Sequence, residues 1–268
     1  MPTSHGPTHT VADLSRFFDH FAPSELAESW DNVGLLVGDP AQAVQRVMTC
    51  LTITPATARE AIAGGANLIV THHPLPFRPL QRLTVQSSEG RLLWELIGSR
   101  VSVYCPHTAF DSAAEGINQR LAAGLELEAI APLAEGNVPG LGAGRFGRLA
   151  SPLRLADLAE RVKRLLAIDH AQAVGPLENM VQTVAVACGS ASEFLPVAAA
   201  AGCHAIVTGE LRFHSCLEAE FLGLGVVLAG HYASERFALD ELAITLGQKF
   251  PELQVWASQQ ERDPVHWL

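Results

Sequence analysis

The sequence lacks the marks of a secreted, membrane-spanning or nucleic-acid-binding protein. Its five cysteines are odd in number and form no C-x-x-C pair, which is typical of free thiols in a reducing compartment. It has no run of Lys and Arg, and its net charge is −10, so we expect no direct nucleic-acid binding. Apolar stretches such as 223–230 are too short to cross a bilayer, and residues 1–10 carry no signal-peptide pattern. These absences predict a cytoplasmic protein that does not enter a membrane.

The chain has the size and composition of an ordinary globular protein. Its 268 residues, 48% of them hydrophobic and 17% charged, are enough for one large domain or two smaller α/β units that each bury a core. The acidic balance does not exclude a nucleotide as substrate, because the phosphates of a nucleotide can bind to metal ions.

Two segments of the chain resemble each other without a gap. Residues 46–73 read RVMTCLTITPATAREAIAGGANLIVTHH, and residues 183–210 read TVAVACGSASEFLPVAAAAGCHAIVTGE. At this offset Gly65 falls on Gly202, and an Ile-Val-Thr sequence occurs in both. Each segment predicts a strand, an Ala-rich helix and a second buried strand, which together form a βαβ unit.

The similarity extends beyond these segments. Ala-Asp-Leu opens a predicted helix at 12–14 and again at 156–158, and 101–111 aligns with 226–235 when His107 is placed on His231. We therefore predict an α/β fold of two similar repeats, with mostly parallel sheets that face each other across a metal-binding cavity. The predicted boundaries are 1–125 for the first repeat, 126–152 for a linker rich in Gly, Pro and Ala, and 153–268 for the second repeat. Chance similarity between two Ala/Val-rich units is the alternative.

Polar residues follow the predicted strands of both repeats, where ligands bind in open parallel sheets. His72 and His73 follow one strand, and both can approach one site only because Pro74 ends that strand. After two other predicted strands, a His precedes an acid by four residues, as in His107 with Asp111 and His231 with Glu235. Such pairs also occur as plain surface features, but their recurrence at equivalent strand ends favours a metal site.

Five segments closely resemble the signature segments of the Nif-three-like dinuclear metal-centre family, also called the GTP cyclohydrolase 1 type 2 family. They are WDNVGLLVG (30–38), THHPLPF (71–77), HTAFD (107–111), TGELRFH (208–214) and GHYASE (230–235). The resemblance implies two similar α/β halves, two divalent metal ions between them and assembly into homohexamers. The short linker indicates the compact form of the family, without an inserted domain.

The resemblance implies a ligand set, residue by residue: His72, His73, Asp111, His231 and Glu235, the last as the bridging ligand. His107 is expected beside the metals, either as an occasional ligand or as a hydrogen-bond donor to a residue that is a ligand. The family's T-G-D is here Thr208-Gly209-Glu210, and its G-S-G-S turn is Gly189-Ser190-Ala191-Ser192.

Imidazole and carboxylate ligands suit Zn, Mn, Fe, Co or Ni, and five of them leave open positions on two ions. We therefore expect a metal-dependent hydrolase with a small-molecule substrate, nucleotide-type or phosphorylated. Candidate catalytic acids and bases are His107, Glu210 and His214, each of which could instead support the ligands. The alternatives are a non-catalytic regulatory or scaffold protein that acts through partner proteins, and a metal delivery or storage protein.

Overall fold

The computed structural model describes residues 9–266, so the N-terminal residues considered for a signal peptide lie almost wholly outside it. The chain divides into two units, which we describe separately. Unit 1 comprises residues 9–110 and 238–262, and unit 2 comprises residues 111–237 and 263–266. Among the described residues, no helix combines the length and the apolar character that crossing a membrane requires.

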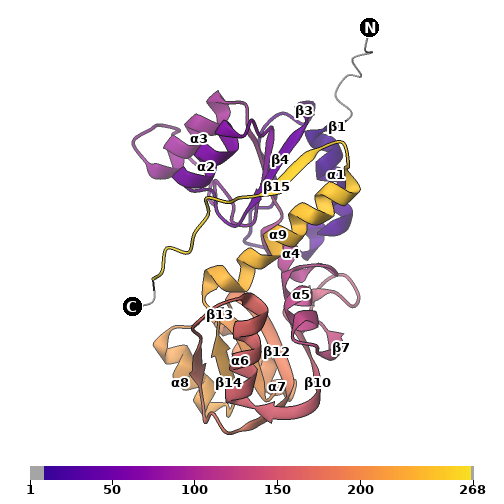
Figure 1. Ribbon diagram of the computed structural model, residues 1–268, viewed down its shortest axis with the longest axis vertical. Helices are drawn as coiled ribbons and strands as arrows, with labels where there is room; N and C mark the ends of the chain where they lie inside the picture. The colour runs from indigo at the N-terminus through magenta and orange to yellow at the C-terminus, as the bar shows by residue number, and fades with distance from the viewer. Residues whose placement is uncertain (1–8, 267–268) are drawn as a thin grey trace. The chain divides into compact units, whose positions relative to one another are not determined.

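Unit 1 is built on a five-stranded sheet in the order β15-β4-β5-β6-β2, of which Figure 1 labels β15 and β4. β15, β4, β5 and β6 are parallel, and β2 is antiparallel to β6 at the edge. A short antiparallel pair, β1 and β3, lies beside α1. The strands of unit 1 are β1 (His9–Thr10), β2 (Gly34–Val37), β3 (Ala43–Val44), β4 (Arg46–Cys50), β5 (Leu68–Thr71), β6 (Ser102–Cys105) and β15 (Gln254–Ala257).

Helices cover both faces of this sheet (Figure 1), and the residues of β4, β5 and β6 are buried except Arg46. Met48 and Ile69 pack in a core with residues of α2 and α3. On the other face, the ring of Tyr104 stacks on Phe18 of α1 at 4.6 Å. The helices that contribute to unit 1 are α1 (Val11–Phe21), α2 (Pro55–Ala63), α3 (Ser88–Gly98), most of α4 (His107–Ser112) and the C-terminal part of α9 (His231–Lys249).

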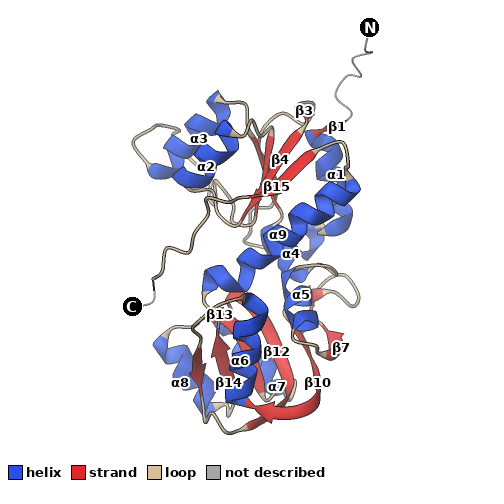
Figure 2. Ribbon diagram, in the orientation of Figure 1, coloured by secondary structure: helices blue, strands red, loops and turns tan. Residues whose placement is uncertain are grey.

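Unit 2 is built on a six-stranded mixed sheet in the order β11-β14-β13-β12-β10-β7 (Figure 2). Its three central strands, β12, β13 and β14, are parallel, and the outer pairings are antiparallel. The strands are β7 (Glu128–Ala131), β10 (Arg145–Arg154), β11 (Gln172–Val174), β12 (Met180–Ser190), β13 (Ala205–Glu210) and β14 (Gly225–Leu228), with a separate pair β8 (Ala134–Glu135) and β9 (Gly142–Ala143). The helices are α5 (Ile117–Gly124), α6 (Leu155–Leu166), α7 (Leu195–Ala200) and α8 (Phe213–Phe221).

The two βαβ segments have the same strand register. β4 pairs with β5 so that Val47 lies opposite Leu68, and β12 pairs with β13 so that Val184 lies opposite Ala205. These four residues correspond at the sequence offset that aligned 46–73 with 183–210. The predicted pair of βαβ units is therefore present, and the parallel pairing agrees with the predicted α/β fold class.

The aligned glycines explain part of the sequence match. Gly65 has a φ of +66° and Gly202 has a φ of +74°, a left-handed conformation that ends the helix of each unit. The amide of Gly65 donates to Ile62, and that of Gly202 donates to Ala199, the corresponding residue. A residue with a Cβ would be strained at either position.

The strands β6 in unit 1 and β14 in unit 2 are also followed by equivalent features, but the spacing differs by one residue. Ile69 lies opposite Val103 in unit 1, and Ile206 lies opposite Val226 in unit 2. His107 and His231 each begin a helix after this strand, but one residue more separates strand and helix in unit 2. The predicted alignment of the two histidines is thus correct at the helix starts.

The predicted linker, residues 126–152, contributes strands to unit 2. β7 and most of β10 lie in it, and β10 pairs with β12. The buried Arg145 explains how this Gly-rich segment is fixed, because its guanidinium donates to four backbone carbonyls and to Gln119. Two of those carbonyls lie at the C-terminal end of α4, at Ser112 and at Ala113, which follows it. Composition predicted a linker here, and the strands were not predicted.

The C-terminal segment also departs from the predicted extent of the second repeat, because β15 joins the sheet of unit 1. The carboxylate of Glu60, on α2, accepts hydrogen bonds from four groups of this segment. They are Trp256 Nε1 (3.3 Å), Ser258 Oγ (2.5 Å), Gln259 N (2.9 Å) and Gln260 N (3.0 Å). Burial by itself would raise the pKa of Glu60, but these bonds lower it below its ordinary value.

We predict that Glu60→Gln destabilises unit 1 in a pH-dependent way. Because the pKa of Glu60 is lowered by folding, its stabilisation is present above the ordinary glutamate pKa of about 4.3 and is lost as the pH falls through the lowered value. At pH 7 the variant should lose about 1–3 kcal/mol of unfolding free energy, measured by urea denaturation. Glu95→Gln, at an exposed position on α3, is the control. Equal stability of wild type and Glu60→Gln at pH 7 would contradict the assignment.

Candidate metal centre

Three histidines of unit 1 form a compact cluster. His72 and His73 directly follow β5, and His107 begins α4 after β6. One ring nitrogen from each lies within 4.8 Å of those of the other two. The ring centroids are 5.1 Å apart for His72 and His73, 5.1 Å for His72 and His107, and 5.9 Å for His73 and His107.

The backbone after β5 brings the two adjacent histidines to one site. β5 ends at Thr71, but the amide of His72 still donates to Cys50 O at 3.1 Å, and that of His73 to Leu51 O at 2.8 Å. The hydroxyl of Thr71 donates to the His73 carbonyl, which bends the chain back on itself. The two side chains therefore do not point to opposite faces as they would within a strand.

Asp31 holds the ring of His107. Its Oδ1 lies 2.7 Å from His107 Nδ1, and its Oδ2 accepts from both the amide and the hydroxyl of Thr108. Burial would raise the pKa of Asp31, but the hydrogen bonds from His107 and Thr108 outweigh it and lower the pKa to about 2. Since this carboxylate only accepts, the proton of a neutral His107 ring lies on Nδ1 and the lone pair on Nε2.

Thr52 holds the ring of His73 in a comparable way. Its hydroxyl lies 2.7 Å from His73 Nδ1, and its amide donates to Glu261 Oε1 at 2.7 Å. The other oxygen of Glu261 accepts from Leu51 N at 2.9 Å. The C-terminal segment therefore supports the loop that positions His73.

The donor set fits a divalent transition metal ion. Three imidazoles in one cluster suit Zn, Fe, Co or Ni, whereas Mg and Ca prefer oxygen ligands. Hydrogen bonding of the second ring nitrogen to an oxygen, as in His73 and His107, is the usual arrangement of metal-binding histidines.

A second set of candidate ligands lies in unit 2. His231 Nε2 is 3.2 Å from Glu235 Oε2, one helical turn further along α9, and His231 Nδ1 is 3.2 Å from Glu210 Oε1. Gly189, with a φ of +64°, leaves room for this pair, because a Cβ there would lie 2.3 Å from Glu235 Oε1. The left-handed φ and this close approach together favour glycine at position 189.

The electrostatics of this set favour a cation. The hydrogen bond to Glu235 is the main cause that raises the pKa of His231 to about 9, and Glu210 adds to it although burial opposes it. Nearby, Cys188 Sγ donates to Asp111 Oδ1 at 3.1 Å. Burial first, and then the charges of Asp111 and Glu235, raise the pKa of the Cys188 thiol well above its usual range. Glu210 and Glu235 thus contact the imidazole of His231, and Asp111 accepts from the neutral thiol of Cys188.

The predicted site residues fall into two local groups and one outlier. His72, His73 and His107 lie together in unit 1, while His231, Glu235 and Glu210 lie together in unit 2, where Asp111 contacts Cys188. His214 is exposed on α8, and its ring contacts Phe213. The prediction that five of these residues share a dinuclear centre stays a prediction.

Several residues of these groups escaped the sequence analysis. The sequence analysis assigned no role in the site to Asp31, Thr52, Cys188 or Glu261. Asp31 is 76 residues from His107, and Glu261 is 209 residues from Thr52, so no local spacing could have linked them. The only signal in the sequence was the position of Asp31 within the WDN segment. None of the five cysteines, all in the described part of the chain, forms a disulfide.

Comparison with known proteins places these residues in a family context. The family model described as Duf34/NIF3 (NGG1p interacting factor 3) matches residues 9–264. The chain is 35% identical over 270 residues to a Streptomyces coelicolor protein named GTP cyclohydrolase 1 type 2 homolog, covering 95% of this chain and 93% of the relative. A Clostridium acetobutylicum protein of the same name is 33% identical over 227 residues, covering 84% of this chain and 85% of the relative.

Solved structures have the same fold. A Bacillus cereus protein related to NIF3 matches with a TM-score of 0.90 at 23% identity, covering 98% of this chain and all of that one. A hypothetical protein from Staphylococcus aureus matches with a TM-score of 0.88 at 27% identity, covering 97% and 99%.

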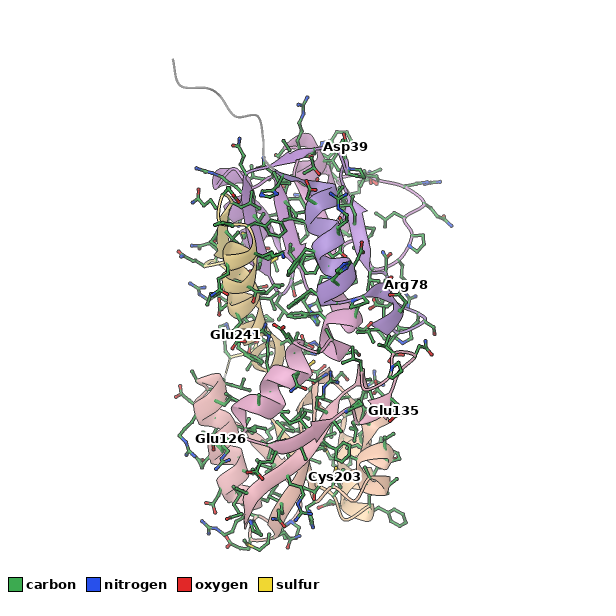
Figure 3. All side chains as sticks on the ribbon, turned by 90° about the vertical axis from the view of Figure 1, so that its right-hand side faces the viewer. Asp39, Arg78, Glu126, Glu135, Cys203 and Glu241 are labelled. Carbon is green, nitrogen blue, oxygen red and sulfur yellow. The ribbon has the colours of Figure 1, made fainter. Side chains whose placement is uncertain are left out.

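We predict that Asp31→Asn weakens metal binding to the histidine cluster by about 10–100-fold, as loss of such a partner does elsewhere. An Asn amide can donate to His107 Nδ1, which would move the ring proton to Nε2 and block its lone pair. The affinity is measured by competition with a chelating dye. Asp39→Asn, an exposed acid in the same unit (labelled in Figure 3), is the matched control. Unchanged affinity of Asp31→Asn would show that His107 does not bind the ion through Nε2.

Proposed function

The chain belongs to the Duf34/NIF3 family, and from this premise we propose that it is a metal-dependent hydrolase acting on a nucleotide-type or phosphorylated substrate. The names of two relatives support the proposal, since a GTP cyclohydrolase adds water to a purine ring. Among substrates of this class we therefore favour guanine nucleotides.

The observation that carries the proposal is the cluster of His72, His73 and His107. A histidine packed only for stability needs no second and third imidazole within 4.8 Å of it. Two of the rings have an oxygen atom at Nδ1, and with the ring proton on Nδ1 the lone pair lies on Nε2, as in metal-binding histidines. Such an imidazole set without thiolates is typical of ions that keep open positions for a reaction.

We propose that two divalent ions are held by His72, His73, Asp111, His231 and Glu235, with His107 as a further ligand on the side of the histidine cluster. Such ions would act as Lewis acids and activate water for attack on the substrate. Asp31 and Thr52 would keep their histidines in the binding tautomer, and Glu210 would do the same for His231. The exposed Glu210 carboxylate can in addition accept a proton from the reaction.

The proposal is tested by removing metal with a chelator and reloading the protein separately with Zn, Mn, Fe, Co and Ni. Metal content is measured by mass spectrometry, and hydrolysis of guanine nucleotides and phosphate esters by chromatography of the products. We expect about two ions per chain and turnover that depends on them. His20→Ala, at an exposed position on α1, is the control for non-specific histidine binding. Full metal loading without turnover would instead favour a non-catalytic metal-binding scaffold.

Single substitutions should separate the roles of the ligands. We predict that Glu235→Ala lowers the occupancy of both ions, whereas His72→Ala and His73→Ala each mainly lower one. A carboxylate offers two oxygens that can bridge, while a neutral imidazole donates one lone pair. Equal loss of both ions from all three variants would exclude Glu235 as the bridging ligand.

We also propose that the protein is cytoplasmic and forms a homohexamer, as the family resemblance implies. Light scattering at micromolar concentration should give a mass of about six chains of 28.6 kDa. A monomer under these conditions would contradict the hexamer without bearing on metal binding.

A further inference from the structure

Trp30 and Phe77 are exposed aromatic residues beside the histidine cluster. Their exposed fractions are 60% and 41%, whereas Phe18, Phe110 and Tyr104 of the same unit are buried. The centroids of the two rings are 6.1 Å apart, with planes at 70°. Water-exposed aromatic surface of this size is unfavourable unless something covers it.

Both rings also contact His107. The centroid of Trp30 lies 6.1 Å from that of His107, and the centroid of Phe77 lies 6.3 Å from it, both edge to face. The rings of Trp30, Phe77 and His107 therefore all contact one another, and we call them the corner. One of them, His107, belongs to the candidate metal centre. Because the two planes are at 70°, a planar ligand ring that stacks on one of them would meet the other at its edge, and it would lie next to a metal held by the cluster.

The corner is held in place by hydrogen bonds of the neighbouring residues. Asp31, next to Trp30, binds His107 and Thr108. Asn32 Nδ2 donates to Pro76 O at 2.7 Å and so joins the segment of Trp30 to that of Phe77. Because these segments are already ordered, binding a planar ring would cost little additional conformational entropy.

The loop that carries Phe77 is basic in an otherwise acidic chain. Residues 74–85 contain Arg78 and Arg82 and no Asp or Glu, although the net charge of the chain is −10. Both arginines are exposed, and Arg78 (labelled in Figure 3) directly follows Phe77. A guanidinium binds phosphate through two parallel hydrogen bonds, and aromatic side chains bind the faces of bases.

We propose that Trp30 and Phe77 bind the planar ring of a nucleotide, and that Arg78 binds its phosphate. This inference rests on the proposed function and names the residues that recognise its substrate class. A nucleotide fits better than a sugar phosphate, because a sugar phosphate has no aromatic ring to pack against Trp30 and Phe77. It also fits better than an uncharged aromatic compound, which would leave the arginines unused.

The test measures binding separately from turnover. Metal-loaded wild-type protein is titrated with GMP and with ribose 5-phosphate, which lacks the base, by calorimetry. Trp30→Ala should weaken GMP binding about 10-fold or more and leave ribose 5-phosphate binding unchanged. Trp30→Phe should restore most of the GMP affinity, and Arg78→Gln should weaken both compounds. Trp94→Ala is the matched control, because Trp94 is also 60% exposed but lies on α3.

Metal content and solution mass are measured for every variant. The inference is overturned if wild type binds GMP no better than ribose 5-phosphate, if Trp30→Ala binds GMP like wild type, or if Trp30→Ala changes the oligomeric state. The last result would assign the two rings to a contact between chains. Base-dependent GMP binding through Trp30 without any hydrolysis would support this inference and reject the hydrolase. Hydrolysis that is insensitive to Trp30→Ala would support the hydrolase and reject this inference.

Discussion

The parallel pairing of β5 with β4 and β6 decides where the histidine cluster of unit 1 lies. Parallel strands end at one edge of a sheet, so residues that follow β5 and β6 are brought together whatever their distance in sequence. The backbone bonds of His72 and His73 to the end of β4 prolong this pairing by two residues beyond the strand. The side chains on the loops, Asp31 and Thr52, can then fix the rings, because the backbone that carries the rings is already fixed.

The same strand geometry in unit 2 carries a different set of side chains, for a steric reason. The residues that correspond to His72 and His73 are Gly209 and Glu210. A Cβ on Gly209 would lie 2.6 Å from Gly189 O and 2.9 Å from His231 Cα, so no imidazole fits there. Glu210 instead binds His231 Nδ1, which is the role of Asp31 toward His107. In both units a carboxylate thus binds the histidine that begins a helix, whereas the other candidate metal ligands around that histidine differ.

Sequence reasoning succeeded where a feature is encoded locally. The βαβ register follows from apolar strands and a left-handed glycine at a fixed distance, and the histidines follow directly after those strands. It failed where partners come from distant parts of the chain. β15 joins β4 because Glu60 collects four donors from residues 256–260, and no periodicity in either segment indicates that pairing. The strands in 126–152 depend in the same way on Arg145, a single buried residue whose carbonyl partners have no sequence signature.

The two units offer a cation different chemical environments. The cluster in unit 1 consists of three imidazoles, and Asp31, a carboxylate of the same unit, is bound to His107 and Thr108. An ion held mainly by these rings keeps most of its positive charge and hence its capacity to polarise an anionic substrate. The set in unit 2 is rich in carboxylates, two of which raise the pKa of His231, and would bind a cation more strongly while neutralising it. If both sets hold ions as proposed, affinity and Lewis acidity would be supplied by different residues, so that a change that strengthens one need not weaken the other.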